Sequence, residues 1–266
     1  MSTQIAVITH KEYQIPDDPL YVPVWAGSSL AVHVPDGYIR DDNGDNISEK
    51  NPFFCELTGL YWVWKNLTAD NIGICHYRRY FSADSGGAGN CFGSASQKYT
   101  GKALNGRMMT SIDAERIMRT TEIVLPAPRD YHFESNYSQY AHAHNHEDLD
   151  EARSVIACKY PAYIEFFDRR MEMPGGHRFN MFIMRRELLN EYCSWLFEIL
   201  FELEKRLNIS GYSERDRRVF GYVGERLLDV WIDAGGYRYK EVPYIMTERE
   251  YLLSKAVRMI GRRFTR

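Results

Sequence analysis

The sequence lacks the features that mark several large classes of protein. Its five cysteines form no CxxC pair and are odd in number, so we expect a reducing compartment and no disulfide framework. With 33 basic and 36 acidic residues, the net charge of -3 argues against a nucleic-acid partner, because nucleic-acid binders carry a basic surplus. No stretch approaches the roughly 20 apolar residues that span a bilayer, and residues 1–13 lack the pattern of a signal peptide. We therefore expect a cytoplasmic protein, or one peripheral on the inner face of the cytoplasmic membrane.

Short motifs of several enzyme classes are also absent. The chain has no GxGxxG, P-loop, GxSxG or kinase signature. Its 266 residues are 44% hydrophobic and 14% aromatic, which excludes a disordered chain and allows one large domain with a real core. Aromatic side chains of this number serve a core, and they also serve as platforms on which sugars or bases stack.

Strand-like and helix-like segments alternate along the chain. Short apolar runs predict buried strands at 4–9, 71–75, 123–125 and 177–184. Apolar residues at helical spacing predict helices that begin at Pro52 and lie at 111–119, 149–170 with a break near Pro161, 187–208 and 217–231. The alternation indicates an α/β sandwich with a mainly parallel central sheet, in which ligands bind beyond the carboxyl ends of the strands.

The most informative residues stand at these strand ends. His10 and Lys11 follow the first strand, and four functional side chains follow the second: His76, Tyr77, Arg78 and Arg79. The planar fork of arginine matches the oxygens of a phosphate or carboxylate. Structural salt bridges to nearby acids are an equally weighted alternative. Adjacent arginines point to opposite sides of a continuing strand, so only one of them need reach a ligand.

Two patterns suggest a metal site but are explained better in other ways. His142, His144 and His146 alternate, yet no cysteine lies close in sequence and HExxH is absent, so a polar pocket wall or a solvated surface is favoured. Asp148 and Asp150 form a DxD pair of the kind that nucleotide-sugar transferases use to hold a divalent cation. Here the pair begins a predicted helix, where acids suit the helix N-terminus.

The C-terminal residues 252–266 form a basic amphipathic segment without acids. Its cations are Lys255, Arg258, Arg262, Arg263 and Arg266. Such a segment can lie on an anionic membrane face, where each basic residue contributes about 1 kcal/mol. A frayed and solvated tail is the alternative.

Five segments, taken in order, resemble the bacterial DUF4422 family. They are HKEY (10–13), GDNISEKNPFFCELTGLYWVWKN (44–66), GICHYRRYF (73–81), NMFIMRRELLNEYCSWLF (180–197) and RRVFGYVGERLLDVW (217–231). Members of this family are found among capsule, exopolysaccharide and O-antigen glycosyltransferases. The resemblance implies a GT-A-like, Rossmann-type single domain over 1–250, followed by the tail at 251–266. It also implies transfer of a hexose, commonly galactose in pyranose or furanose form, from a UDP-sugar. We expect a lipid-linked oligosaccharide as the acceptor.

The resemblance also suggests how the leaving group is stabilised. GT-A enzymes carry carboxylates after the strand that corresponds to 71–75, whereas this chain carries HYRR. We expect these cations to replace a metal at the UDP phosphates, so no cofactor is predicted. The donor-binding set is then His10, Lys11, His76, Tyr77, Arg78 and Arg79.

The remaining roles stay open. An inverting transfer needs a base for the acceptor hydroxyl, and the candidates are Glu225, Asp216, Glu56 and His144. Glu56 could instead orient Arg78 or a donor hydroxyl, and Glu225 could be a buried arginine partner. His144 and Asn180 are expected on the acceptor side, with the Gly- and Ser-rich segment 82–106 as a lid. Two alternatives come from other classes: a non-catalytic carbohydrate- or nucleotide-binding module, and a metal hydrolase built on the three histidines.

Overall fold

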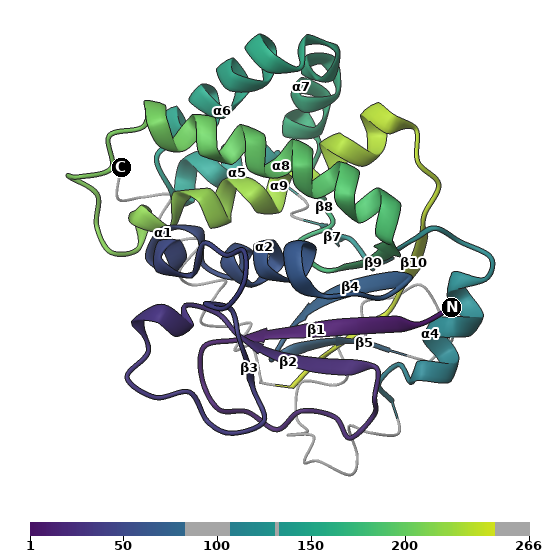
Figure 1. Cartoon of the computed structure of the whole chain (residues 1–266). Helices are drawn as coiled ribbons and strands as arrows, with labels where there is room; N and C mark the ends of the chain where they lie inside the picture. Colours follow the sequence, from purple (N-terminus) through teal and green to yellow (C-terminus); the bar gives the residue numbers. More distant parts are fainter. Residues whose placement is uncertain (83–106, 131–132, 248–266) are drawn as a thin grey trace.

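The computed structural model of the chain describes residues 1–82, 107–130 and 133–247. The proposed lid, apart from Ser82 itself, and the basic tail lie outside these ranges, so both remain predictions. Figure 1 shows a central sheet with most of the helices stacked on one side of it.

The described strands form a nine-stranded sheet and a separate two-stranded one. Seven strands of the large sheet follow the order β10-β6-β9-β4-β1-β2-β3, and β5 and β11 extend it beside β4. Their bounds are β1 (Thr3–Thr9), β2 (Tyr21–Trp25), β3 (Ile39–Arg40), β4 (Asn71–His76), β5 (Arg79–Phe81), β6 (Ile123–Pro126), β9 (Phe182–Arg185), β10 (Lys240–Val242) and β11 (Tyr244–Met246). The small sheet pairs β7 (Arg129–Asp130) with β8 (Gly175–Gly176). Along the seven-strand path, β9 runs antiparallel to both its neighbours and the other pairings are parallel, which confirms the predicted mainly parallel sheet.

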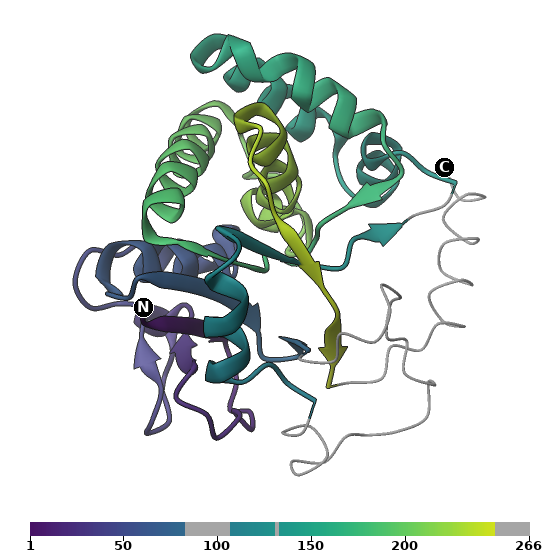
Figure 2. The same ribbon diagram turned by 90° about the vertical axis from the view of Figure 1, so that its right-hand side faces the viewer.

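Helices cover the sheet in layers. The α-helices are α1 (Asn51–Phe54), α2 (Leu57–Asn66), α4 (Ser111–Met118), α5 (Asn136–Ala143), α6 (His146–Lys159), α7 (Ile164–Glu172), α8 (Arg186–Arg206) and α9 (Val219–Gly235). Short 3-10 turns stand at η1 (Ser28–Leu30), η2 (Ser48–Lys50), η3 (Pro161–Tyr163) and η4 (Asp216–Arg218). Helices α2, α8 and α9 lie over the sheet, and α6 and α7 form an outer layer beyond them (Figures 1 and 2). None of the helices in the described ranges is long and apolar enough to span a bilayer.

Alternating side chains of β1 divide the core between the two faces of the sheet. Ala6 and Ile8 join the large cluster under α2, α8 and α9, whereas Ile5 and Val7 join the smaller cluster on the opposite face. The strand is thus buried on both sides, as expected for the interior of a parallel sheet.

Two predicted elements differ from the structure. The segment 177–184 was expected to be one strand, but β9 begins only at Phe182, because Phe179 and Asn180 adopt positive φ angles of 77° and 49°. A single helix was expected from Pro52 onward, but Cys55 has φ 53° and divides it into α1 and α2. Both differences place irregular backbone beside the site described below.

A buried carboxylate fixes the loops around α1 and α2. Asp41 is inaccessible to solvent and accepts hydrogen bonds from the backbone amides of Gly27 and Ser28, each at 2.9 Å. The hydroxyl groups of Ser48 and Thr58 donate to the same carboxylate at 2.5 and 2.8 Å. Because a buried charge is tolerated only when it is well paired, these four donors determine where η1, η2 and α2 meet.

Candidate functional site

A cleft of about 490 Å³ opens at the carboxyl ends of β1 and β4. The register of these parallel strands pairs Ile8 with His76, so the residues that follow the two strands emerge side by side. The cleft is lined by residues from both strand ends, from α1 and from the entry to α9: Ile8, Thr9, His10, Ala26, Asn51, Pro52, Cys55, Glu56, His76, Tyr77, Arg78, Glu214 and Arg218. It therefore lies where ligands bind in open α/β sheets.

Tyr77 is the centre of a cationic cluster at this edge. Its ring is buried and lies 5.1 Å from the guanidinium carbon of Arg78 and 4.9 Å from Lys11 Nζ. The imidazole of His10 meets the same ring edge-on, with the centroids 5.4 Å apart. Cation–π contacts of this kind hold positive charge at a partly desolvated site.

Arg79 takes a different direction from Arg78. It begins β5, and its guanidinium carbon lies 4.1 Å above the ring of Phe179. Arg78 lines the cleft and Arg79 does not. The adjacent arginines have different surroundings because the strand does not continue: Arg78 lies in the turn after β4, whereas Arg79 begins the antiparallel β5.

The two cleft imidazoles are neutral at neutral pH. Burial, together with the positive charges of Arg79 and Arg78, lowers the pKa of His76 to about 3. Burial also lowers the pKa of His10, together with Lys11 and Arg78. A neutral imidazole can still donate one hydrogen bond to a ligand oxygen.

A carboxylate, Glu56, lines the same cleft. Burial raises the pKa of Glu56, and the nearby Glu225 carboxylate raises it further. Asn180 Nδ2 donates a hydrogen bond to Glu56 Oε1 at 2.9 Å. The other amide atom, Asn180 Oδ1, is buried and has no hydrogen-bond partner among the described residues.

Arg218 is a cleft cation that no local sequence pattern indicates. Its Nε donates to Cys55 Sγ at 3.0 Å, and burial together with the Glu56 carboxylate raises the pKa of Cys55 to about 11, so the thiol is protonated. Arg218 ends the short turn η4 just before α9. Glu214 also lines the cleft, and no local pattern indicates it either. Only the tertiary start of α9 brings these two residues to the ends of the strands.

Three of the four candidate bases do not line the cleft. Asp216 accepts a hydrogen bond from Ser213 Oγ at 2.7 Å, and His144 Nδ1 lies 3.9 Å from Asp216 Oδ1. The ring of His144 stacks on that of Tyr222, with the centroids 3.9 Å apart, and the guanidinium carbon of Arg218 lies 5.6 Å from the Tyr222 centroid. The third is Glu225, which lies on α9 next to Glu56.

The motifs weighed as metal sites have local partners in the structure. His142 Nδ1 lies 2.7 Å from Glu134 Oε1. Asp148 stands in the first turn of α6, as predicted, and accepts a hydrogen bond from the hydroxyl of Tyr212 at 2.6 Å. The part of the chain that the structure describes contains no group of three His, Cys, Asp or Glu side chains arranged to hold a metal ion.

Comparison with known proteins places the chain in a family. The profile of a domain of unknown function, DUF4422, matches residues 4–236. The chain is a member of the DUF4422 family. The apo structure of the WbbM bifunctional glycosyltransferase is similar, with a TM-score of 0.85 and 27% identity over 94% of this chain and 46% of that one. This DUF4422 chain thus spans less than half the length of that structure. No curated protein matches it.

The low pKa of His76 predicts a loss of stability in acid. The unfolded chain binds a proton near pH 6.5, whereas folded His76 binds it only near pH 3. Between these values the unfolded state holds more protons, so lowering the pH should reduce the free energy of unfolding by up to about 1.4 kcal/mol per pH unit for this residue. Urea unfolding at several pH values measures this slope. His76→Gln should lose that part of the slope and Asn51→Ala, in the same cleft, should keep it; equal slopes in wild type and His76→Gln would contradict the assignment.

Proposed function

We propose that this chain is a glycosyltransferase that moves a hexose from a UDP-sugar to a glycan acceptor without a metal ion. The observation that carries the proposal is one cleft that holds two guanidinium groups, Arg78 and Arg218, together with Glu56, a carboxylate of raised pKa. A bifunctional glycosyltransferase that shares this fold over 94% of the chain supports the same reaction class. A nucleotide-sugar donor and a glycan acceptor follow from that class.

The cationic side of the cleft suits the departing diphosphate. Negative charge develops on the β-phosphate oxygens of UDP as the bond to the sugar breaks. Arg78 and Arg218 would stabilise this charge, and the neutral imidazoles of His10 and His76 would donate hydrogen bonds to it. A divalent cation would be repelled by the guanidinium groups, which supports a mechanism without metal.

The carboxylate side suits the acceptor. An inverting transfer needs a base that removes the proton of the attacking hydroxyl, and Glu56 is the candidate base that lines the cleft. Its raised pKa makes it a stronger base than an ordinary glutamate, and it remains deprotonated when the pH exceeds that value. Asn180, whose Oδ1 has no hydrogen-bond partner among the described residues, would hydrogen-bond a sugar hydroxyl beside Glu56.

The finer identity of the substrates rests on the family resemblance. We propose galactose, in pyranose or furanose form, as the hexose and a lipid-linked oligosaccharide as the acceptor, in capsule, exopolysaccharide or O-antigen synthesis. The basic segment 252–266 would hold the enzyme near the membrane that carries such an acceptor.

Release of UDP tests the reaction class directly. The purified protein should release UDP from UDP-galactose, in pyranose or furanose form, when a glycan acceptor is present, and EDTA should leave the rate unchanged. Complete loss in EDTA with recovery in Mn²⁺ would contradict the metal-free mechanism. Binding of UDP-sugars without any UDP release would instead show a non-catalytic module.

The two cleft arginines should matter far more for turnover than for folding. Arg78→Ala and Arg218→Ala should each lower kcat by about ten- to a hundredfold, because each removes a preorganised donor to the leaving group. Arg153→Ala is a matched control, since Arg153 pairs with Asp168 on the exposed surface of α6. Unchanged kcat in both cleft variants would contradict the assignment.

The base assignment predicts both a rate and a pH effect. Glu56→Gln should lower kcat by about a hundredfold or more while nucleotide binding persists. Because the Glu225 charge raises the pKa of Glu56, Glu225→Gln should shift the acid limb of the kcat/KM profile to lower pH. Rates measured from pH 5 to 9 decide the matter, and an unshifted or upward-shifted limb would argue against Glu56 as the base.

A further inference from the structure

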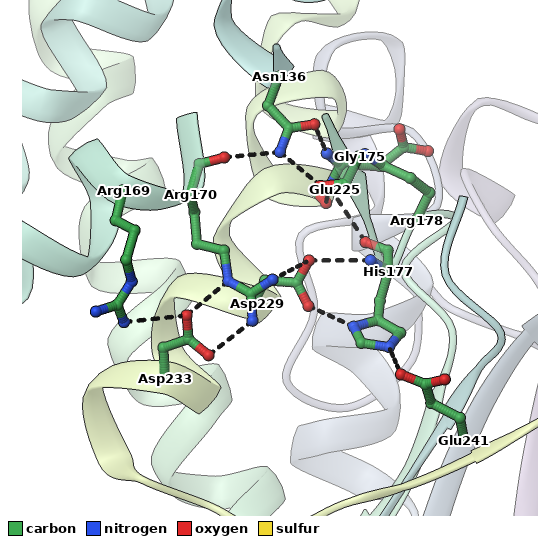
Figure 3. Close-up of polar contacts among 10 residues, drawn as sticks. All are labelled: Asn136, Arg169, Arg170, Gly175, His177, Arg178, Glu225, Asp229, Asp233 and Glu241. Atoms are coloured by element: carbon green, nitrogen blue, oxygen red, sulfur yellow. Dashed lines mark hydrogen bonds and ion pairs between the residues drawn. The ribbon is translucent and has the colours of Figure 1, made fainter. Parts of the chain in front are cut away.

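A second polar cluster lies behind the cleft, between α9 and the turn that precedes β9. Figure 3 shows Asp229 of α9 pointing at His177. Asp229 Oδ2 accepts a hydrogen bond from the backbone amide of His177 at 2.9 Å, and Asp229 Oδ1 lies 2.5 Å from His177 Nδ1. Asp229 and His177 are only 2% and 3% exposed, so water does not compete for these contacts.

The same turn is held at its next residue. Arg178 Nη1 donates to the backbone carbonyl of Glu225 at 3.3 Å, and Nη2 donates to the side chain of Asn136 (Figure 3). Asn136 in turn donates to the carbonyl of Gly175 at 2.7 Å. The turn is therefore fixed from α9 and from α5 together.

These contacts stabilise a backbone that is otherwise unfavourable. Phe179 and Asn180 have φ angles of 77° and 49°, in the left-handed region that residues other than glycine seldom adopt, and a bulky residue such as Phe least of all. The neighbouring Gly176, at φ 149°, also has no room for a side chain, because a Cβ there would lie 2.3 Å from Asp229 Oδ2. Asp229 thus both requires the glycine and anchors the turn.

The strained turn ends beside Glu56, which lines the cleft. It directs the Asn180 amide toward Glu56, at 2.9 Å, and places the Phe179 ring under the guanidinium of Arg79. Asn180 itself is 3% exposed, so its position is set by the turn and not by solvent. The backbone from His177 to Asn180 links the buried Asp229 to the carboxylate that we propose as the base.

The Asp229 carboxyl group is ionised while it anchors the turn. Burial raises the pKa of its carboxyl group, but the hydrogen bond from His177 and the nearby charges of Arg170 and Arg178 bring the pKa below its usual value. On its far side, His177 Nε2 lies 3.3 Å from Glu241 Oε1 of β10. The imidazole therefore bridges two carboxylates, and it cannot rotate without breaking both contacts.

We propose that Asp229 and His177 are positioning residues that fix the strained turn and so aim the Asn180 amide at Glu56. The catalytic role of this positioning rests on the proposed function, in which Glu56 is the base. An amide N–H stabilises the charged form of a carboxylate, so a loosened turn raises the pKa of Glu56. The other titratable or charged groups near Glu56 or in the same cleft are Glu225 of α9, Arg218 of η4, Glu214 before η4, Cys55 between α1 and α2, His10 after β1, His76 at the end of β4 and Arg78 in the turn after β4. Neither Asp229→Asn nor His177→Leu alters any of them.

The experiment is a pH titration of the Asn180 side-chain amide by NMR in protein labelled with ¹⁵N-asparagine. In the wild type the amide shift should titrate with Glu56, and Glu56→Gln should abolish that titration. Asp229→Asn and His177→Leu should raise the midpoint by about 0.5–1 pH unit, the value of one hydrogen bond. In turnover assays the acid limb of kcat/KM should move upward by the same amount.

Two matched variants separate positioning from general damage. Asp233 lies one turn further along α9, where its carboxylate accepts hydrogen bonds from Arg170 at 2.6 and 2.7 Å and does not contact His177. Asp233→Asn should therefore leave the midpoint of the Asn180 titration at its wild-type value. His177→Asn keeps a donor near the place of Nδ1 and should restore the wild-type midpoint. If Asp229→Asn does not fold, the comparison of His177→Leu with His177→Asn decides.

Three results would overturn the inference. They are an unchanged midpoint in folded Asp229→Asn or His177→Leu, an equal upward shift in Asp233→Asn, and a His177→Asn midpoint as high as that of His177→Leu. The titration needs no turnover. Absence of UDP release in the wild type would therefore defeat the proposed function, whereas a failed titration would defeat the positioning role alone.

Discussion

The close approach of α9 to the junction of α1 and α2 determines the chemistry of the cleft. The chain kinks at Cys55, and α9 can lie against this kink because it presents glycines there. A Cβ at Gly221 would lie 3.3 Å from Cys55 Sγ, and one at Gly224 would lie 2.8 Å from Leu57 Cδ1. Larger residues would push α9 away, and with it Arg218 and Glu225. The contact thus brings two carboxylates and a guanidinium group into one partly buried space.

Charge is separated across this space. Arg78 and the cations around Tyr77 lie at the rim of the sheet, whereas Glu56 and Glu225 lie on the helical side, where Arg218 donates to Cys55 beside Glu56. Burial disfavours the charged form of a side chain. It therefore lowers the pKa of the His10 and His76 imidazoles and raises the pKa of Glu56. An anion bound at the rim would offset the positive field. A hydroxyl near Glu56 would meet a carboxylate able to accept its proton. In the function that we propose, this polarity would orient a substrate that has a phosphate at one end and a sugar at the other.

The part of the site on the strands could be predicted from the sequence, because apolar runs define where buried strands end. His10, His76 and Arg78 follow such runs directly. Arg218 could not be found in this way, because only the tertiary start of α9 carries it to the sheet edge. The mostly apolar run HRFNMFIM predicts a strand over 177–184, but residues 177–181 form a turn. Its positive φ angles depend on Asp229, about fifty residues later, and no local pattern encodes that contact.

Several features of the cleft oppose stability. The neutral His76, the carboxylate pair of Glu56 and Glu225, and the left-handed residues Phe179 and Asn180 are each less favourable than an apolar, relaxed alternative. They lie within one contiguous region, whereas the remaining core is conventionally packed around β1. Strain and desolvation concentrated in this way are typical of preorganised sites, in which groups are held ready for a ligand at the expense of folding free energy. The buried Asp229–His177 contact and the four donors around Asp41 offset that expense, because each holds one side of the cleft against relaxation.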